Sequence, residues 1–438
     1  MNTNTPIPYS TAKAAIDSFR IPDFAGATIR DIVNIANKIE QETGESFVRL
    51  EIGSPGFPPE NIGKQAELQA IERGVSSQYP PLHGIEPLKS AASRFIKAFV
   101  NVDISARSCI PTSGSMQACC AAFMACGQCD PDRNRILFID PGFPVQKLQA
   151  TMLGMPFDSF DTYSYRGGKL AGKIEEYLSS GRYCAMLYSN PNNPSWACLT
   201  DSELQQIGAL SRKYDVIVIE DLAYFGMDFR QDITRPYEPP FQPSVAHYTD
   251  LYMLMISGSK AFSYAGQRIA VAAISDTLFE RSYPGLQQRY GVGAFGTVYV
   301  NRILYALTAG TAHSAQYALA AMLDAAVKGE YNFLHDVYEY GRRAKKLKEI
   351  FLANGFHLVY DKDIDQPVGD GFYFTIGYPG KTGVQLMYEL LFYGVSAIAL
   401  NSTGSTQEGL RICTSFVRAE QYGLLEQRMK QFNENNKQ

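Results

Sequence analysis

Residues 251–275 read LYMLMISGSKAFSYAGQRIAVAAIS, and this stretch decides the expected fold. Two short, almost wholly apolar runs, Leu251–Ser257 and Arg268–Ser275, flank a loop that contains serines, a lysine and a glycine. Apolar runs of this length are typical of strands that helices cover on both faces, as in a mostly parallel sheet. The loop is therefore expected to lie at the edge of a buried sheet.

Short apolar runs of the same kind occur upstream, and they predict three further strands at Arg135–Asp140, Tyr183–Asn190 and Asp215–Asp221. Between the last two, the residues Thr200–Glu203 (TDSE) form a capping box, which predicts the start of a helix. Strands that alternate with helices favour an α/β domain, in which ligand groups gather at the carboxyl ends of the strands.

The composition and the expected secondary structure change after about residue 300. A helical region rich in Ala, Leu and Tyr is expected from Asn301 to about Asn354, and its basic stretch RRAKKLKE is read as a solvated helix face. Strands are expected around Gly371–Ile376 and Leu410–Ser415. The predicted domains are an N-terminal segment (1–60) that joins a small domain, a large domain (61–300), and an interdomain helix with the C-terminal small domain (301–438).

Composition excludes several classes of protein. The 438 residues carry 40 Lys and Arg against 44 Asp and Glu, a formal net charge of -4, without the basic patch of a nucleic-acid binder. No stretch approaches ~20 apolar residues, so no membrane span is expected. The N-terminus lacks a basic segment followed by an apolar run, so no secretory signal is expected and the predicted location is cytoplasmic.

Cysteine and histidine spacing predicts no metal site. Cys126 and Cys129 form the one CxxC motif among the eight cysteines. A redox pair or half of a zinc site is the alternative to free thiols in a reducing compartment, which we favour. The five histidines show no metal-like spacing.

Several polar residues follow the expected strands. Lys260 can act as an amine nucleophile if its surroundings lower its pKa, and nearby serines with Arg268 can bind a phosphate. Asp221 closes a very apolar strand, so its carboxylate must cap a helix, pair with a charge or serve a ligand. Each of these features has an ordinary structural explanation when it is taken alone.

Three other motifs stand at comparable positions. NPNNP (190–194) is a turn or part of a site, because Asn and Pro cluster in turns. Gly114 precedes an expected helix, whose free N–H groups offer an anion site. Phe143, in DPGFP, presents an aromatic ring at the same edge or belongs to the core.

In this order, the motifs resemble those of fold-type I pyridoxal-phosphate (PLP) enzymes, specifically the class I/II aminotransferases, from about Leu50 to Arg411. SGSKAFSYAGQRIA resembles the family signature S-x-S/T-K…G-x-R-x-G, and NPNNP resembles N-P-x-N-P-T-G. Two family glycines are replaced, by Trp196 and Ala270. The resemblance implies an α/β fold: a large domain with a mostly parallel seven-stranded sheet flanked by helices, and a smaller α+β domain built from both chain termini.

The resemblance also assigns roles around the cofactor. Lys260 is expected to form the Schiff base with PLP and to act as the general base. Asp221 is expected to face the pyridine nitrogen, and Tyr224 to share the phenolic oxygen with Asn193. The other residues that the resemblance places at the cofactor are Gly114, Ser115, Met116, Phe143, Ser257, Ser259 and Arg268, together with Tyr79, which reaches the phosphate of the neighbouring subunit.

The implied function is transfer of the amino group of an L-amino acid to a 2-oxo acid, with 2-oxoglutarate as the expected acceptor, in a ping-pong mechanism. Gly53, Asn193 and Arg411 are expected to bind the substrate, with Arg411 on its α-carboxylate. The role of Tyr79 implies a homodimer with shared active sites. A C–S β-lyase on the same fold and a non-catalytic PLP-binding regulator remain the alternatives, because these motifs hold the cofactor without selecting the outcome.

Overall fold

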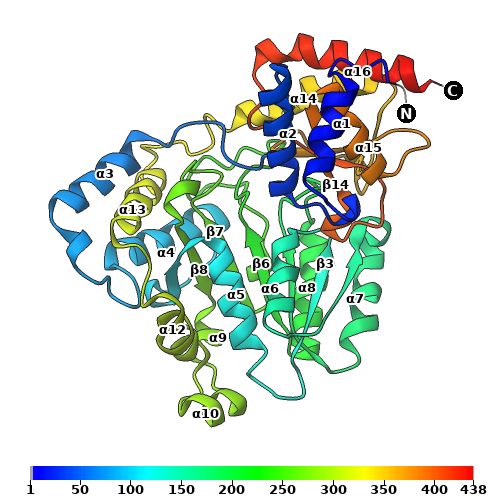
Figure 1. The fold of residues 1–438 in the computed structure, drawn as a ribbon. Coiled ribbons are helices and arrows are strands. Elements are labelled where there is room, and N and C mark those ends of the chain that lie inside the picture. Colours follow the sequence, from blue (N-terminus) through cyan, green and yellow to red (C-terminus); the bar gives the residue numbers. More distant parts are fainter. Residues whose placement is uncertain (1–2, 438) are drawn as a thin grey trace. The chain divides into compact units, whose positions relative to one another are not determined.

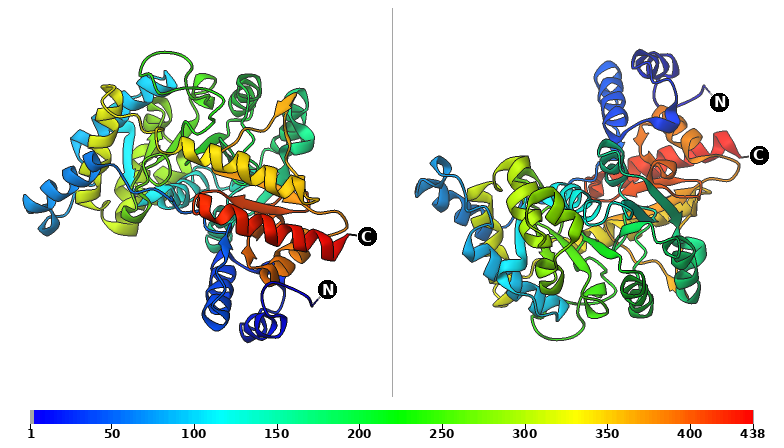
Figure 2. Two further views of the ribbon diagram at one scale, coloured as in Figure 1. Left: turned by 90° about the horizontal axis from the view of Figure 1, so that it is seen from above. Right: turned by 90° about the horizontal axis from the view of Figure 1, so that it is seen from below.

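The computed structural model describes residues 3–437, which divide into two compact units. The sheet unit contains residues 57–192 and 198–337. The terminal unit contains the described residues up to 56, the short segment 193–197 and the described residues from 338 onward. The first and the last described segments therefore belong to the same unit (Figure 2).

The sheet unit is built on seven strands in the order β2-β8-β7-β6-β5-β3-β4. All neighbouring strands are parallel except at β8, which runs antiparallel to both β2 and β7. This is the predicted mostly parallel, seven-stranded α/β sheet. The strands are β2 (Cys109–Thr112), β3 (Arg135–Asp140), β4 (Phe157–Asp161), β5 (Tyr183–Ser189), β6 (Ile217–Leu222), β7 (Tyr252–Ser257) and β8 (Ala270–Ile274).

Helices cover this sheet because its strands are apolar on both faces; β5, β6, β7 and β8 are buried throughout. Helix α5 packs across β6, β7 and β8, and α6 lies beside it (Figure 1). The helices of this unit are α3 (Asn61–Glu72), α4 (Glu86–Val100), α5 (Gly114–Cys126), α6 (Pro144–Met152), α7 (Leu170–Leu178), α8 (Asp201–Tyr214), α9 (Asp276–Glu280), α10 (Pro284–Tyr290), α11 (Phe295–Val298), α12 (Tyr305–Thr308) and α13 (His313–Val327).

Local sequence signals explain where some of these helices begin. Helix α8 starts at the predicted capping box: the Thr200 hydroxyl accepts a hydrogen bond from the Glu203 N–H at 3.3 Å, and the Glu203 carboxylate accepts one from the Thr200 N–H at 3.0 Å. Within residues 3–437, no helix combines the length and the apolar character needed to cross a bilayer.

The terminal unit is an α+β structure. Its four-stranded antiparallel sheet has the order β14-β15-β12-β9, and β1 pairs in parallel with β13. The strands are β1 (Val48–Arg49), β9 (His357–Leu358), β10 (Lys362–Asp363), β11 (Gln366–Pro367), β12 (Tyr373–Gly377), β13 (Val395–Ser396), β14 (Ile398–Ala399) and β15 (Leu410–Cys413). The helices are α1 (Tyr9–Ser18), α2 (Ile29–Thr43), α14 (Tyr338–Ala353), α15 (Gly383–Leu390) and α16 (Tyr422–Asn436).

The structure differs from the sequence expectation after residue 300. The region 301–354 is helical over most of its length, as expected, with interruptions after Thr308 and after Val327. Residues 301–337 belong to the sheet unit, since α13 packs on α3 and α4. The segment 193–197 differs in the opposite sense, because it packs with the terminal unit although both flanking segments belong to the sheet unit.

Candidate active site

The carboxyl ends of four parallel strands, β3, β5, β6 and β7, lie along one edge of the large sheet. Ser189 of β5 pairs directly with Asp221 of β6, and β7 ends at Ser257, three residues before Lys260. Because β6 and β7 are neighbours, Asp221 and the loop that carries Lys260 start from adjacent strand ends. This placement agrees with the position of ligand sites in parallel α/β sheets.

Backbone hydrogen bonds fold the loop that carries Lys260 back on itself. The Tyr264 N–H donates to the Gly258 carbonyl at 2.9 Å, and the Ser263 N–H donates to the Lys260 carbonyl at 3.1 Å. These bonds place the lysine within a closed turn rather than on an extended, solvated segment.

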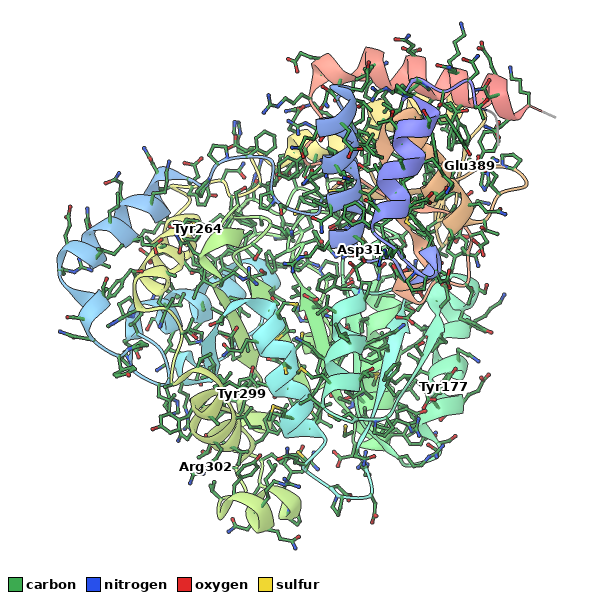
Figure 3. All side chains as sticks on the ribbon, viewed as in Figure 1. Asp31, Tyr177, Tyr264, Tyr299, Arg302 and Glu389 are labelled. Carbon is green, nitrogen blue, oxygen red and sulfur yellow. The ribbon has the colours of Figure 1, made fainter. Side chains whose placement is uncertain are left out.

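A buried carboxylate holds the same loop from outside. The Tyr264 hydroxyl donates to the Glu67 carboxylate at 2.5 Å, and the Ser314 hydroxyl donates to it at 3.0 Å. Glu67 lies on α3 and Ser314 on α13, so two helices hold the loop through one side chain. Tyr264 is labelled in Figure 3, and burial beside Glu67 raises its pKa well above the usual range of a phenol.

A candidate anion site lies where α5 begins. Gly114 has a left-handed φ of +74°, which favours glycine, and a Cβ there would lie 2.5 Å from Nη2 of Arg268 and so displace that exposed guanidinium. The buried hydroxyl of Ser115 has no hydrogen-bond partner among residues 3–437. In the neighbouring loop, the Ser257 hydroxyl accepts a hydrogen bond from the Ser259 N–H at 3.1 Å. Free helix N–H groups, hydroxyls and a guanidinium together favour a phosphate-like anion.

Asp221 is almost fully buried at the end of β6. Its carboxylate accepts hydrogen bonds from the Gln146 side chain at 2.8 Å and from the Ala223 N–H at 3.1 Å. Burial raises its pKa to about 6, and these two hydrogen bonds only partly oppose that effect. Gln146 lies on α6, and Phe143 is the N-cap of that helix. Tyr224, which is also buried, follows Asp221 by three residues. A carboxylate held this way is suited to a cationic ligand group, which would compensate its buried charge.

Two other buried carboxyl groups near Asp221 have identifiable protein partners. Asp140, at the end of β3, pairs with Lys147, and burial still raises its pKa to about 6. Glu220 is adjacent to Asp221 in β6, so its side chain points to the opposite face of the sheet. It accepts a hydrogen bond from the Ser244 hydroxyl at 2.5 Å, and burial raises its pKa to about 7.

In the terminal unit, Arg411 is buried in an arrangement that fixes its guanidinium. Nη2 donates to the Glu51 carbonyl at 2.7 Å, and the guanidinium carbon lies 4.7 Å from the centroid of the Tyr373 ring. The buried Nε has no hydrogen-bond partner among the described residues. At Gly53, a Cβ would come within 2.5 Å of the Tyr373 hydroxyl. Arg411 and Gly53, two residues predicted to bind the substrate, therefore both lie next to Tyr373.

Asn193 and Trp196 lie in the short segment that belongs to the terminal unit. Trp196 is completely buried although its φ is +62°, a left-handed conformation that costs a residue with a Cβ roughly 1–2 kcal/mol. A Cβ at Gly371 would come within 2.0 Å of the Trp196 ring, so the indole lies directly on that backbone. The replacement of the family glycine therefore has a definite packing consequence.

The other predicted residues lie as follows. Tyr79 is 89% exposed, and Met116 is also exposed at the start of α5. Three further aromatic side chains are buried. Tyr264 belongs to the network described above, the Tyr299 hydroxyl donates to the Ala118 carbonyl at 3.1 Å (Figure 3), and Phe372 packs on Tyr340.

Sequence reasoning missed Gln146, Glu67 and Tyr373. Gln146 follows the DPGFP motif by two positions, but no spacing rule marks a glutamine there as the partner of Asp221. Glu67 and Tyr373 are far from their partners along the chain, so only the fold reveals them.

A family model described as "Aminotransferase class I and II" matches residues 45–425 of this chain. The chain belongs to the class I and II aminotransferase family. In agreement with this, the structure superimposes on an alanine aminotransferase from Pyrococcus furiosus with a TM-score of 0.75, covering 95% of this chain and 99% of that one at 19% identity. At that identity the likeness shows the shared fold alone.

Similarity to curated members of the family is partial. The chain is 30% identical to a probable N-acetyl-LL-diaminopimelate aminotransferase of Bacillus subtilis over 244 residues. The aligned region covers 55% of this chain and 58% of the relative. It is 25% identical over 234 residues to an aspartate aminotransferase of Thermotoga maritima, covering 53% of this chain and 59% of that one. The chain thus spans less than two thirds of the length of these curated relatives.

Pyridoxal phosphate is the cofactor of this family. The residues present fit its chemistry. The partnerless Ser115 hydroxyl and the tight approach of Gly114 to Arg268 suit its phosphate, and the buried carboxylate of Asp221 suits a protonated ring nitrogen. Lys260, in the loop that follows the neighbouring strand β7, carries an amine of the kind that condenses with an aldehyde.

Proposed function

We propose that this protein is a PLP-dependent aminotransferase that moves the amino group of an L-amino acid to a 2-oxo acid, with 2-oxoglutarate as the acceptor, in a ping-pong reaction. The observation that carries the proposal is the origin of Asp221 and the Lys260 loop from adjacent parallel strand ends, beside a candidate anion site. When bound, PLP supplies an aldehyde that condenses with amines and a ring that accepts electrons from the substrate Cα.

Separate residues of the chain are proposed to control the protons, the cofactor and the substrate. Asp221 keeps a proton on the ring nitrogen, because a buried anion raises the pKa of a neighbouring cation. Asn193 and Tyr224 donate hydrogen bonds to the phenolic oxygen. Lys260 Nζ takes the proton from the substrate Cα and delivers it to the C4′ carbon of the cofactor. Arg411 binds the α-carboxylate and so orients the Cα–H bond.

The proposal is tested with a panel of amino donors and 2-oxoglutarate on the purified, PLP-loaded protein. The panel includes aspartate, alanine, aromatic amino acids and LL-diaminopimelate, the amino donors that the names of similar proteins suggest. Formation of glutamate and of the 2-oxo acid of one donor supports transfer. Release of pyruvate and ammonia from a sulfur amino acid, without glutamate, supports the β-lyase instead, and no turnover with any donor favours the regulator.

Arg411→Ala is expected to raise the KM for the amino donor about 100-fold, because removing one partner of a buried charge pair costs several kcal/mol. Initial rates at varied donor concentration measure the effect. Arg342→Ala, which removes an exposed arginine of the same unit, is the matched control and should leave KM unchanged. An unaltered KM in Arg411→Ala would count against the role given to this arginine.

We further propose a homodimer in which Tyr79 reaches the phosphate bound by its partner. The 89% exposure of Tyr79 supports this role, because a large exposed aromatic side chain is typical of an association surface. Other large apolar side chains exposed on the sheet unit are Leu68, Ile71, Met116, Leu148, Met152, Tyr237, Tyr305 and Leu307.

The shared site predicts complementation between two inactive variants. Lys260→Ala and Tyr79→Ala should each be impaired alone, but after the two are unfolded together and refolded, activity should return to at most about a quarter of wild type. Half of the randomly paired dimers then contain one intact site. A light-scattering mass of twice 48.6 kDa is also expected. A monomer, or a mixture that stays inactive, would contradict the shared site.

A further inference from the structure

Trp196 combines two features that require an explanation. It holds a left-handed backbone conformation, with φ at +62°, and its side chain is fully buried. A residue with a Cβ persists in such a conformation only where the surrounding structure determines it, and such positions cluster at functional sites. The contacts of the indole show what that surrounding structure is.

The indole packs against a backbone that has little freedom to move. A Cβ at Gly371 would lie 2.0 Å from Cε2 and 2.1 Å from Nε1 of Trp196. The Gly371 carbonyl accepts a hydrogen bond from the buried Thr414 hydroxyl at 3.1 Å, which holds this stretch of backbone next to β15. The indole therefore occupies space that only a glycine at 371 leaves open.

From Gly371 the packing continues to Tyr373. The Trp196 and Tyr373 rings meet edge to face, with centroids 6.3 Å apart and an interplanar angle of 71°. Tyr373 is itself buried, so the indole limits the orientations that the phenol ring can adopt.

Tyr373 in turn contacts Arg411. Tyr373 pairs with Cys413, and Thr375 with Arg411, so Tyr373 and Arg411 are diagonal neighbours on one face of the β12–β15 pair. The guanidinium carbon lies 4.7 Å from the ring centroid, within the range of a cation–π contact. One face of the guanidinium lies on the ring and Nη2 donates to the Glu51 carbonyl, whereas the buried Nε has no hydrogen-bond partner among residues 3–437.

We propose that Trp196 and Tyr373 are positioning residues that hold the Arg411 guanidinium at the orientation in which it receives a carboxylate. The proposal rests on the role given above to Arg411 and extends it to a residue that replaces a family glycine. Trp196 fixes the Tyr373 ring, and the ring fixes the plane of the guanidinium. A bidentate carboxylate contact depends on that plane, because both N–H···O bonds must be aligned at once.

The test is a double-mutant cycle on the PLP-loaded protein, with the dissociation constant of 2-oxoglutarate, measured by calorimetric titration, as the readout. Trp196→Gly restores the family residue, and it is expected to weaken binding about tenfold when Arg411 is present, a typical coupling between residues that share a packing partner. In the Arg411→Ala background the same change should have less than a twofold effect. The affinity for PLP and its absorbance spectrum should stay as in wild type.

A pair of milder variants keeps the test decisive if Trp196→Gly does not fold. Tyr373→Leu removes the aromatic face and should weaken 2-oxoglutarate binding, whereas Tyr373→Phe keeps the face and should largely restore it. Phe432 lies on α16 in the core of the same unit, and Phe432→Ala leaves a cavity there. This variant controls for a general loss of stability. It should lower the melting temperature without changing the dissociation constant.

The outcomes separate this inference from the proposed function. If Arg411→Ala weakens binding and the Trp196 and Tyr373 variants weaken it equally in both backgrounds, or not at all, the positioning role is overturned while the role of Arg411 stands. If Arg411→Ala leaves binding unchanged, the carboxylate role of Arg411 fails, and the inference fails with it.

Discussion

Lys260→Ala is expected to reduce amino-group transfer on the order of 10⁴-fold, because it removes both the amine that holds the cofactor and the base that moves the Cα proton. Steady-state turnover with the best donor of the panel measures the loss. A second readout is independent of turnover: borohydride reduction of the loaded wild-type protein should fix one PLP to the peptide that contains Lys260, and the variant should retain none.

A matched lysine controls for the loss of a positive charge. Lys213 is exposed on α8 of the same unit and pairs with Glu175, so Lys213→Ala should retain wild-type turnover and labelling. Normal turnover by Lys260→Ala, or labelling at a different lysine, would remove the basis of the proposed mechanism.

Asp221→Asn is expected to lower turnover by roughly 10²–10³-fold, the effect of removing one preorganised electrostatic partner from a reacting group. Asparagine has nearly the same shape but carries no charge, so it no longer favours a proton on the ring nitrogen. The loss should appear in turnover at saturating donor. Glu220→Gln is the matched control, because Glu220 is the neighbouring buried carboxyl on the opposite face of β6 and should leave turnover near wild type.

The same substitution should change how the stability of the cofactor-free protein depends on pH. Burial raises the pKa of Asp221 from 3.8 to about 6, so the folded protein keeps a proton that the unfolded chain releases. This stabilising contribution is complete below about pH 3.8 and is lost as the pH rises to about 6. Asp221→Asn has no such loss, so the difference in free energy of unfolding between the variant and wild type should shift by about 2 kcal/mol in favour of the variant between pH 4 and 7.

Denaturant titrations of both proteins across this pH range measure the difference, in which Asp140 and Glu220 cancel because both proteins retain them. A difference that does not vary with pH would mean that Asp221 titrates near its ordinary value. Turnover unaffected by Asp221→Asn would contradict its role toward the ring nitrogen.

The large sheet could be predicted because its signal is local. The strands Arg135–Asp140, Tyr183–Ser189 and Tyr252–Ser257 are short apolar runs bounded by polar or glycine-rich turns, and the structure places them within one or two residues of the expected bounds. The capping box at Thr200 is local in the same way. Polar groups at the ends of such strands then follow from the topology of a parallel sheet.

The partners of the site residues could not be predicted, because they depend on contacts between distant segments. Glu67 and Tyr264 lie 197 residues apart, and Arg411 reaches the Glu51 carbonyl across 360 residues. The membership of residues 301–337 in the sheet unit depends on distant contacts in the same way. Their composition predicts helix, which the structure has over most of this stretch, but only the packing of α13 on α3 and α4 reveals the unit to which they belong.

Trp196 lies between these two cases. Its departure from the family pattern is visible in the sequence, but its consequence, burial against Gly371 within the terminal unit, is not.

The membership of residues 193–197 in the terminal unit has a consequence for protein engineering. A chimera that joins this sheet unit to the terminal unit of a relative divides the chain near residues 56 and 337, and this five-residue insert would then stay with the wrong parent. If the donor carries any residue other than glycine at the position of Gly371, the recipient's indole has no space to enter. Exchange of the two parts is thus expected to need three grafts rather than two, with the tryptophan and its glycine travelling as a pair.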